Sequence, residues 1–344
     1  MAIEVSDYYL AHEQRHHLGE GTIFNPLDER FYYVDINCHK IFAYEPRAAK
    51  LEEVADVGEH VSGLAINQDG SLIVARKSGI YYYNDKQEPH WLKVCELEPD
   101  QPQNRPNDTT IVACADGSVR FFVGTMPLKN QPLPDGSGSG SLYVLTPDMA
   151  LKKLAGDLVT TNGLAGFADD NGQTQLFYAD TKKQVVRRAV FSPRLNALIG
   201  PSEVYLDMHD MVGRPDGGGL LQVDTGNGPQ LCYGITAIDS NRVLAFDAHQ
   251  AVASVPKAII NLDPALKDPT KFAVGEIDGE GTMLVTSFDR EPNSEDNSRA
   301  AGKVYAVRLP KTIHAVETPL ATYPSFEQMK ARMSHLTASN PRER

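Results

Sequence analysis

The stretch "NRPNDTTIVACADGSVRFFVGTM" (residues 104–126) contains the signals that decide the fold. Thr109 to Val112 is a run of β-branched and apolar residues, Asp116-Gly117 is a turn signal, and Val119 to Val123 is a second strand-forming run. An Arg, an Asn and an Asp (residues 105, 107 and 108) stand before the first run and not at the turn. The stretch therefore predicts an antiparallel hairpin with a polar cluster at its entrance.

Period-2 strand patterns of the same kind recur along the whole chain. They are "RFYYVDI" (30–36), "SLIVARKSGIYYYN" (71–84), "VRFFVGT" (119–125), "GSLYVLT" (140–146), "QLFYAD" (175–180), "RVLAFD" (242–247), "TMLVTSF" (282–288) and "KVYAVRL" (303–309). One amphipathic helix is predicted, within "SFEQMKARMSHL" (325–336). We expect one all-β domain over residues 1–344, with a polar, helical tail at 325–344.

The strands fall into six similar modules, each a polar residue followed by a short apolar run, a turn and further strands. The predicted module starts are Gly21, Gly63, Asp108, Gly163, Gly217 and Gly275, separated by 42 to 58 residues. Repeats of about this length are typical of propeller blades. Six modules of about four strands each predict a six-bladed β-propeller, which leaves no strand edge exposed. A β-sandwich is the alternative fold.

Charge and composition restrict the partners that we expect. The net charge is −12, which argues against nucleic acid because no basic surface would neutralise the phosphates. No apolar segment has the length of a signal peptide or a bilayer span, so we expect no membrane partner and a cytoplasmic location. Four scattered cysteines favour a reducing compartment, with each thiol a small buried side chain.

The segment 127–141 is rich in Pro, Gly and Ser and interrupts the third module. A strand follows it at once, so we interpret it as a loop over one end of the propeller and not as a linker between two domains. It is a candidate lid over the mouth that holds Glu20 and Asp216, and the alternative is a passive surface loop.

Four modules begin with an oxygen-bearing side chain: Glu20, Asn107, Asn162 and Asp216. The innermost strands of a propeller all run in the same direction along the central channel, so residues at equivalent starts converge at one mouth. Two carboxylates and two amide oxygens form a hard ligand set that suits Ca²⁺, Mg²⁺ or Mn²⁺, and Zn²⁺ less typically. The alternative is that these residues only form turns.

The sequence resembles the SMP-30/gluconolactonase/luciferin-regenerating family, whose members include regucalcin. The resemblance is carried by the quoted stretch 104–126 and by "LGEGTIFNPLDERFYYVDINCHKIFAYEP" (18–46), "TNGLAGFADDNGQTQLFYADT" (161–181) and "RPDGGGL" (214–220). It implies a six-bladed propeller with one catalytic divalent metal, for which Glu20, Asn162 and Asp216 match the protein ligands. It also implies that Asn107 contacts the metal or the substrate, that Arg105 binds substrate, and that Asp216 is the general base.

The chain departs from the family pattern at several positions. Thr22 stands where the family usually has Pro, Thr109 stands where Gly is common, and "PDGGG" replaces "PDGM". Some relatives hold the sugar with an acidic residue of the loop after "GTM", for which this chain offers only Asp135. His17 and His60 are weaker candidates for a role beside the metal or the substrate.

The predicted function is that of a metal-dependent hydrolase, a lactonase that opens a sugar lactone or a similar small lactone. Its cofactor would be one divalent ion, with Ca²⁺ as the first candidate ahead of Zn²⁺, Mn²⁺ and Mg²⁺. One alternative is a phosphotriesterase or another metal-dependent enzyme on the same propeller. A second is a non-catalytic calcium-binding protein. No Gly-x-Ser-x-Gly elbow is present, which argues against a serine hydrolase.

Overall fold

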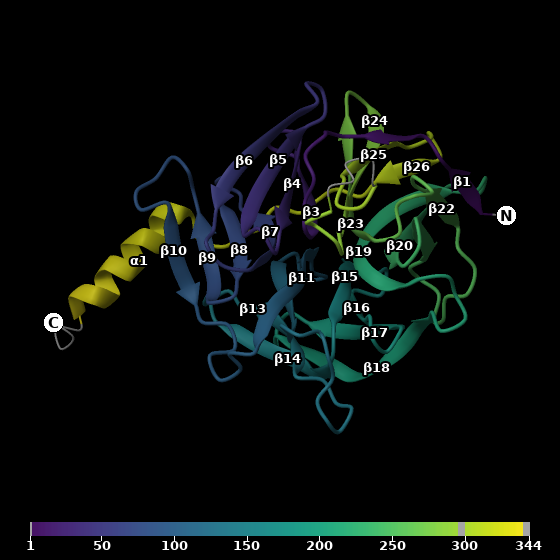
Figure 1. Ribbon diagram of the computed structural model, residues 1–344. Helices are drawn as coiled ribbons and strands as arrows, with labels where there is room; N and C mark the ends of the chain where they lie inside the picture. Colours follow the sequence, from purple (N-terminus) through teal and green to yellow (C-terminus); the bar gives the residue numbers. More distant parts are fainter. Residues whose placement is uncertain (1, 295–299, 340–344) are drawn as a thin grey trace.

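Six sheets stand around a common axis, so the computed structural model, which describes residues 2–294 and 300–339, is a six-bladed β-propeller (Figure 1). This confirms the predicted fold, and the alternative β-sandwich is wrong. All strand pairs in the described residues are antiparallel except β1 (Ile3–Val5) with β22 (Ala258–Asn261). Each of blades 1 to 4 consists of four strands that follow one another in the sequence, whereas blades 5 and 6 also include strands from the terminal segments.

The first strand of each blade lies closest to the channel. Blade 1 consists of β3 (Gly19–Asn25), β4 (Arg30–Asp35), β5 (Lys40–Glu45) and β6 (Lys50–Asp56). Blade 2 consists of β7 (Val61–Ile66), β8 (Leu72–Arg76), β9 (Gly79–Tyr83) and β10 (Trp91–Cys95). Blade 3 consists of β11 (Asn104–Ala113), β12 (Val119–Pro127), β13 (Gly140–Leu145) and β14 (Leu151–Leu158). Blade 4 consists of β15 (Thr161–Ala168), β16 (Thr174–Asp180), β17 (Val185–Ser192) and β18 (Ala197–Asp207).

The last two blades are completed by terminal strands. Blade 5 consists of β19 (Arg214–Asp224), β20 (Pro229–Ile238), β21 (Arg242–Asp247) and β22 (Ala258–Asn261), extended by β1 (Ile3–Val5) and β26 (Ile313–Ala315). Blade 6 consists of β23 (Pro269–Ile277), β24 (Glu280–Ser287), β25 (Tyr305–Arg308) and β2 (Tyr8–Leu10). Because β2 pairs with β25, the start of the chain closes the ring.

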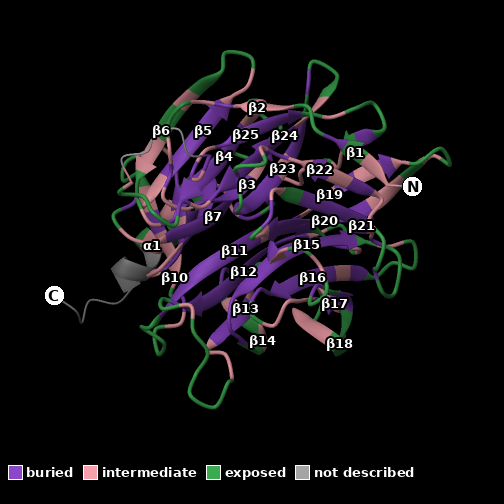
Figure 2. Ribbon diagram, turned by 45° about the vertical axis from the view of Figure 1, so that its right-hand side comes forward, coloured by how far each residue is buried: buried purple, intermediate pink, exposed green. Residues whose placement is uncertain are grey.

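Hydrophobic residues fill the spaces between neighbouring blades. Each of the six core clusters found in the described residues joins two adjacent blades, such as Val34 of blade 1 with Val74 of blade 2. Figure 2 shows that buried residues follow the strands, whereas exposed residues gather in the loops at the periphery. The pairwise arrangement leaves the channel itself free of a continuous apolar core.

Every inner strand has a β-bulge near its start. The register shifts between Glu20 and Ile23, Val61 and Gly63, Pro106 and Thr109, Asn162 and Ala165, Pro215 and Gly218, and Pro269 and Phe272. A bulge gives one strand extra residues against its partner and changes the direction of their side chains. In blades 1 and 4 the bulge contains a glycine at positive φ, Gly21 (61°) and Gly163 (63°), a conformation that disfavours other residues.

The sixth predicted module start is wrong by several residues. Blade 6 begins at Pro269, and Gly275 lies in the second half of β23. A Cβ atom on Gly275 would lie 2.4 Å from Cδ2 of Phe24, so this glycine lets the aromatic ring of blade 1 approach the backbone. The glycine therefore marks a packing contact and not the entrance to a blade.

The C-terminal segment crosses the propeller on the side opposite the strand starts. After β26 pairs with β19, the chain reaches blade 2, where Ala321 forms a parallel bridge with Asn67. Helix α1 (Phe326–Ser339) then packs beside β8 to β10, and its first residue contacts the ring of Tyr82 (Figure 1). This confirms the helix predicted within residues 325–336, while residues 340–344 of the predicted tail lie outside the described residues.

The expectation that every cysteine is buried is only partly correct. All four are free thiols, but Cys38 is exposed and Cys95 is half-buried, while Cys114 and Cys232 are buried. Cys38 lies in the turn after β4, where the side chain points away from the core clusters. No helix in the described ranges is long and apolar enough to cross a membrane.

Asp35, the last residue of β4, fixes the entrance to blade 1. Its carboxylate accepts hydrogen bonds from the backbone N–H groups of His17 (2.8 Å), Leu18 (3.2 Å) and Cys38 (3.0 Å). Burial opposes ionisation, but the side chain of His16 (Nδ1 to Oδ2, 3.6 Å) and these backbone N–H groups outweigh it and hold the pKa of Asp35 well below its ordinary value. Glu20 follows this anchored segment by two residues, so Asp35 positions it.

Asp180 has the same place in blade 4, at the end of β16. Its carboxylate accepts from the backbone N–H groups of Val159 (2.9 Å) and Thr160 (3.2 Å), two residues before Asn162. The sequences "YYVD" and "FYAD" thus each end in an aspartate that fixes the backbone just before a site residue.

We predict that Asp35→Asn lowers the free energy of unfolding at pH 7 by about 1–3 kcal/mol, because buried N–H donors lose a charged acceptor. The folded-state pKa of Asp35 is depressed, so its stabilisation is complete above the unfolded pKa and is lost as pH falls toward the folded value. Urea unfolding should therefore show that the gap between wild type and variant narrows below about pH 4. The exposed Asp85→Asn is the matched control, and a gap that does not depend on pH would contradict the assignment.

Candidate functional site

The side chains predicted to form the site converge at one mouth of the channel. Glu20, Arg105, Asn107, Asn162 and Asp216 are all buried and line a cavity of about 330 Å³. Each lies at or beside the bulge of its inner strand, and together they come from blades 1, 3, 4 and 5. The bulges thus bring residues that are nearly 200 positions apart in the sequence to one cavity.

A chain of hydrogen bonds connects four of these side chains. Nη1 of Arg105 donates to Oδ1 of Asn107 (2.7 Å), and Nδ2 of Asn107 donates to Oδ1 of Asn162 (2.8 Å). Nδ2 of Asn162 then donates to Oδ1 of Asp216 (2.5 Å) and to Oγ1 of Thr181 (2.8 Å). The chain holds the amides and the carboxylate in a fixed mutual arrangement.

The carboxylates of the mouth destabilise one another's charge. Burial, followed by the negative charge of Asp108, raises the pKa of Glu20 to about 8. Burial and the charges of Glu20 and Asp108 raise the pKa of Asp216 well above its ordinary value. Burial lowers the pKa of Arg105 to about 10, although the two site carboxylates oppose this, so the guanidinium stays protonated at neutral pH.

This donor set is compatible with a small hard cation. Neither Glu20 nor Asp216 forms an ion pair with any residue for which the structure gives contacts, and the repulsion between them would be relieved by a positive ion. The described residues contain no cluster of three His, Cys, Asp or Glu side chains suited to a metal, since this set has two carboxylates and two amides. The amide oxygens of Asn107 and Asn162 each accept one hydrogen bond, which leaves a second lone pair on each oxygen for a cation.

A buried ion pair below the mouth was not predicted from the sequence. Nζ of Lys271, from the bulge of β23, donates to Oδ1 of Asp108 (2.7 Å), and both side chains are almost completely buried. Oδ1 and Oδ2 of Asp108 also accept from the backbone N–H groups of Thr109 (2.8 Å) and Leu164 (2.7 Å). Asp108 therefore belongs to the polar cluster predicted at the hairpin entrance, but its partner there is a lysine.

The two histidine candidates have different positions. His60 lines the mouth, and burial, with the nearby charge of Arg105, lowers its pKa to about 4, so the ring is neutral at pH 7. His17 does not line this cavity, and its ring stacks on Phe288 at 6.2 Å. Only His60 can contact a molecule in the mouth.

The loop between β12 and β13 reaches the mouth with its first half only. Leu128 and Asn130 line the cavity, and Oδ1 of Asn130 accepts a hydrogen bond from Oγ1 of Thr160 (2.5 Å). Asp135 lies at the exposed tip, where its carboxylate accepts from the N–H of Ser137 (3.0 Å), and it does not line the cavity. Asp135 is thus not placed to hold a sugar in this conformation.

Three cations at the rim of the mouth carried no recognisable sequence signal. Lys182 follows β16, Arg214 begins β19 and Arg290 follows β24, and all three line the cavity. Many loops of the sequence contain an isolated basic residue. What distinguishes these three from the other basic residues is their position around the mouth, which the sequence alone does not give.

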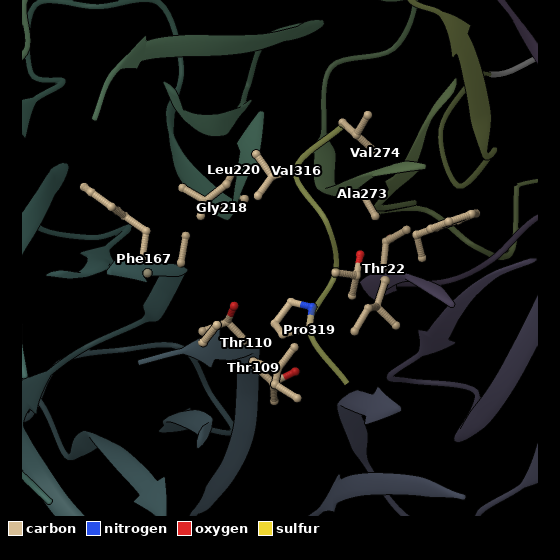
Figure 3. A pocket seen from close by; sticks show the side chains of 18 of the residues that line it. Thr22, Thr109, Thr110, Phe167, Gly218, Leu220, Ala273, Val274, Val316 and Pro319 are labelled. Carbon is tan, nitrogen blue, oxygen red and sulfur yellow. The ribbon is translucent and has the colours of Figure 1, made fainter. Parts of the chain in front are cut away.

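A second cavity, of about 280 Å³, lies at the opposite end of the channel. Its walls are the later halves of the inner strands, and residues 316–319 of the C-terminal segment cross it (Figure 3). Figure 3 shows Val316, Pro319, Leu220 and Phe167 among its lining, which is mostly apolar. Lys271, Glu317 and Cys114 also line this second cavity, but the carboxylates and amides of the predicted site converge on the first cavity, which we therefore consider the functional site.

Comparison with known proteins agrees with this architecture. A family model described as "SMP-30/Gluconolactonase/LRE-like region" matches residues 18–257, which include all the predicted site residues. The chain belongs to this family. It is 28 % identical over 306 residues to the "Putative sugar lactone lactonase YvrE" of Bacillus subtilis, covering 88 % of this chain and 95 % of that protein. It is 26 % identical over 203 residues to the pentonolactonase XacC of Haloferax volcanii, covering 58 % and 62 % of the two chains.

Solved structures of two family members share the fold. A calcium-binding regucalcin from Agrobacterium tumefaciens aligns with a TM-score of 0.76 at 21 % identity, covering 93 % of this chain and 98 % of that one. A luciferin-regenerating enzyme aligns with a TM-score of 0.74 at 21 % identity, covering 92 % and 99 %. At this identity the likeness establishes the propeller alone, and two of the curated relatives carry the name lactonase.

We predict that Lys271→Met lowers the free energy of unfolding by about 3–5 kcal/mol, because it leaves the buried carboxylate of Asp108 without its cation. The double variant Lys271→Met/Asp108→Asn removes both charges and should recover part of this loss. Urea unfolding of the wild type, both single variants and the double variant measures the coupling. Purely additive losses would show that the two side chains do not stabilise each other.

Proposed function

We propose that this protein is a metal-dependent hydrolase that opens a small lactone, and that Glu20, Asn107, Asn162 and Asp216 hold one divalent cation. The observation that carries the proposal is the pair of buried carboxylates, Glu20 and Asp216, which face a small polar cavity and form no ion pair with any described residue. The named lactonases among the relatives support the reaction class. An all-oxygen donor set makes Ca²⁺ the first candidate, ahead of Mg²⁺, Mn²⁺ and Zn²⁺.

The cation, when bound, would supply Lewis-acid polarisation of the lactone carbonyl and a lowered pKa for water. The chain's own residues orient the substrate and move the proton. Nη1 of Arg105 is fixed by the carbonyl of Pro106 (2.8 Å) and by Asn107, while Nε and Nη2 have no hydrogen-bond partner within the described ranges. These two groups are placed to donate to the oxygen on which negative charge develops.

Asp216 is the proposed general base. Asn162 donates to one of its carboxylate oxygens and so fixes the orientation of the group. A carboxylate that is destabilised by burial and by Glu20 is a stronger base than one in water, and it can accept a proton from the attacking water. The proton then passes to the alkoxide that leaves when the ring opens, which gives a hydroxy acid as product.

We predict that Asp216→Asn lowers kcat/KM for an aldonolactone by about 10²–10⁴-fold, since the variant keeps its shape but cannot take the proton. Glu20→Gln should lower activity and should also weaken Ca²⁺ binding, measured by calorimetry on chelator-treated protein. Glu13→Gln, at an exposed position, is the matched control. Full lactonase activity in either site variant would refute the assignment.

A panel of substrates tests the reaction class with the same protein. It comprises aldonolactones, aryl esters and phosphotriesters, each assayed with Ca²⁺, Mg²⁺, Mn²⁺ and Zn²⁺. If the protein hydrolysed only the phosphotriester, the proposed activity would be that of a phosphotriesterase and not of a lactonase. Calcium binding without turnover of any substrate would favour a non-catalytic calcium-binding protein.

The loop between β12 and β13 is the proposed lid. Removing its tip (residues 132–136) leaves Leu128 and Asn130 in place, so we predict native folding and Ca²⁺ affinity but a several-fold change in KM across the lactone panel. Circular dichroism and calorimetry check the first expectation, and steady-state kinetics check the second. Unchanged kinetics would make this segment a passive surface loop.

A further inference from the structure

The rim of the mouth is divided by charge. Its cationic side chains, Lys182, Arg214 and Arg290, come from blades 4, 5 and 6. The other half of the rim, from blades 1 to 3, presents Asn37, His60, Met126, Leu128 and Asn130. The lowered pKa of His60 keeps that half uncharged at pH 7. The rim therefore carries positive charge on one side only, in addition to the buried guanidinium of Arg105 that also lines the mouth.

Two of these cations are held in a fixed orientation by acidic residues. Asp239 lies between the arginines and accepts from Nε of Arg214 (2.6 Å) and from Nη2 of Arg290 (2.7 Å). Asp268 accepts from Nε (2.9 Å) and Nη2 (2.6 Å) of Arg290. Both Nη groups of Arg214 and Nη1 of Arg290 have no partner in the part of the chain that the structure describes. The network thus orients the two guanidinium groups and leaves donors for a ligand.

Lys182 has no such restraint on its ammonium group. Its side chain is exposed, and only its backbone N–H is fixed, by Oδ1 of Asp180 (3.1 Å). The neighbouring Lys183 shows the contrast, since its ammonium pairs with Asp157 (3.2 Å) and does not line the mouth. Among the described residues, none forms an ion pair with Lys182. Its ammonium group is therefore available to a ligand.

The charge balance favours an anion at this half of the rim. Asp239 and Asp268 offset two of the three rim cations, which leaves one uncompensated positive charge. The site acids Glu20 and Asp216 cannot supply the missing anion, because on the proposed function they face the metal. Planar guanidinium groups bind carboxylate and phosphate oxygens through paired hydrogen bonds.

We infer that the lactone taken by this site carries an anionic group, a carboxylate or a phosphate, on the carbon farthest from the lactone carbonyl. Lys182, Arg214 and Arg290 bind this group while the carbonyl lies between Arg105 and Asp216. The inference rests on the proposed function and specifies its substrate class. Both rim arginines are partly exposed, so we expect the preference to be moderate and sensitive to salt.

A matched pair of substrates tests the inference. D-glucono-1,4-lactone and D-glucaro-1,4-lactone share one ring and differ in a terminal hydroxymethyl or carboxylate group. We expect wild-type kcat/KM to be about tenfold higher for the carboxylate form at low ionic strength, the effect of one charge-assisted contact, and the ratio to fall as salt is added. Comparison of 6-phosphoglucono-1,5-lactone with glucono-1,5-lactone decides between phosphate and carboxylate.

Charge-removing variants locate the effect. Lys182→Gln and Arg290→Gln should each lower the anionic-to-neutral ratio several-fold, and Arg290→Lys should recover part of it. Lys152→Gln removes the same charge on the outer strand β14, where Nζ of Lys152 donates to the carbonyl of Leu195 (2.9 Å), and should leave the ratio unchanged. A wild-type ratio of one or less, or a ratio unchanged in both rim variants, would overturn the inference.

The outcomes separate this inference from the proposed function. Turnover of the neutral lactones without any anionic preference would retain the lactonase and refute the anionic substrate. If no lactone is hydrolysed, the proposed function fails, and calorimetry with glucarate then tests the rim alone. Glucarate binding that is weakened by Lys182→Gln would support an anion site, whereas absence of binding would refute it.

Discussion

The site depends on six β-bulges at the same level of the propeller. A regular strand turns alternate side chains to opposite faces, so it cannot direct several consecutive polar residues at the channel axis. Each bulge breaks this alternation once and re-aims the residues beside it. Glu20, Asn162 and Asp216 lie at three of these bulges, and Lys271 lies at another. The fold thus directs side chains toward the channel at six equivalent positions. The residue type at each position determines whether it can bind a ligand or take part in a reaction.

The convergence of these residues concentrates buried carboxylates in one place. Asp108 raises the pKa of Glu20, and both raise the pKa of Asp216, while Lys271 and Arg105 supply positive charge among the described residues. Lys271 neutralises the deeper part of the channel by its contact with Asp108. The carboxylates nearer the mouth have no such partner in the ranges that the structure describes. This separation explains how one channel can contain both a structural ion pair and a set of ligands suited to a cation.

Much of the fold and part of the site could be predicted from the sequence, for identifiable reasons. The hairpin at 104–126 combines alternating apolar residues with turn signals, and the recurrence of such modules indicates a propeller. Glu20 and Asn162 precede glycines that their bulges require at positive φ, so their neighbours mark them. Lys271 and Lys182 have no comparable signal, because their importance comes from contacts or exposure that only the closed ring defines. Gly275 misled the module count because close packing and turns both favour glycine.

The ring closure has a consequence for the order in which the protein is made. Strand β2 (Tyr8–Leu10) is synthesised long before its partner β25 (Tyr305–Arg308). Blades 1 to 5 can pair with their neighbours during synthesis, but β2 must wait until the strands of blade 6 have been made. The nascent chain therefore carries an unpaired strand edge while nearly 300 residues are added. The step that protects this edge is also the step that completes the mouth, since Arg290 belongs to the last blade.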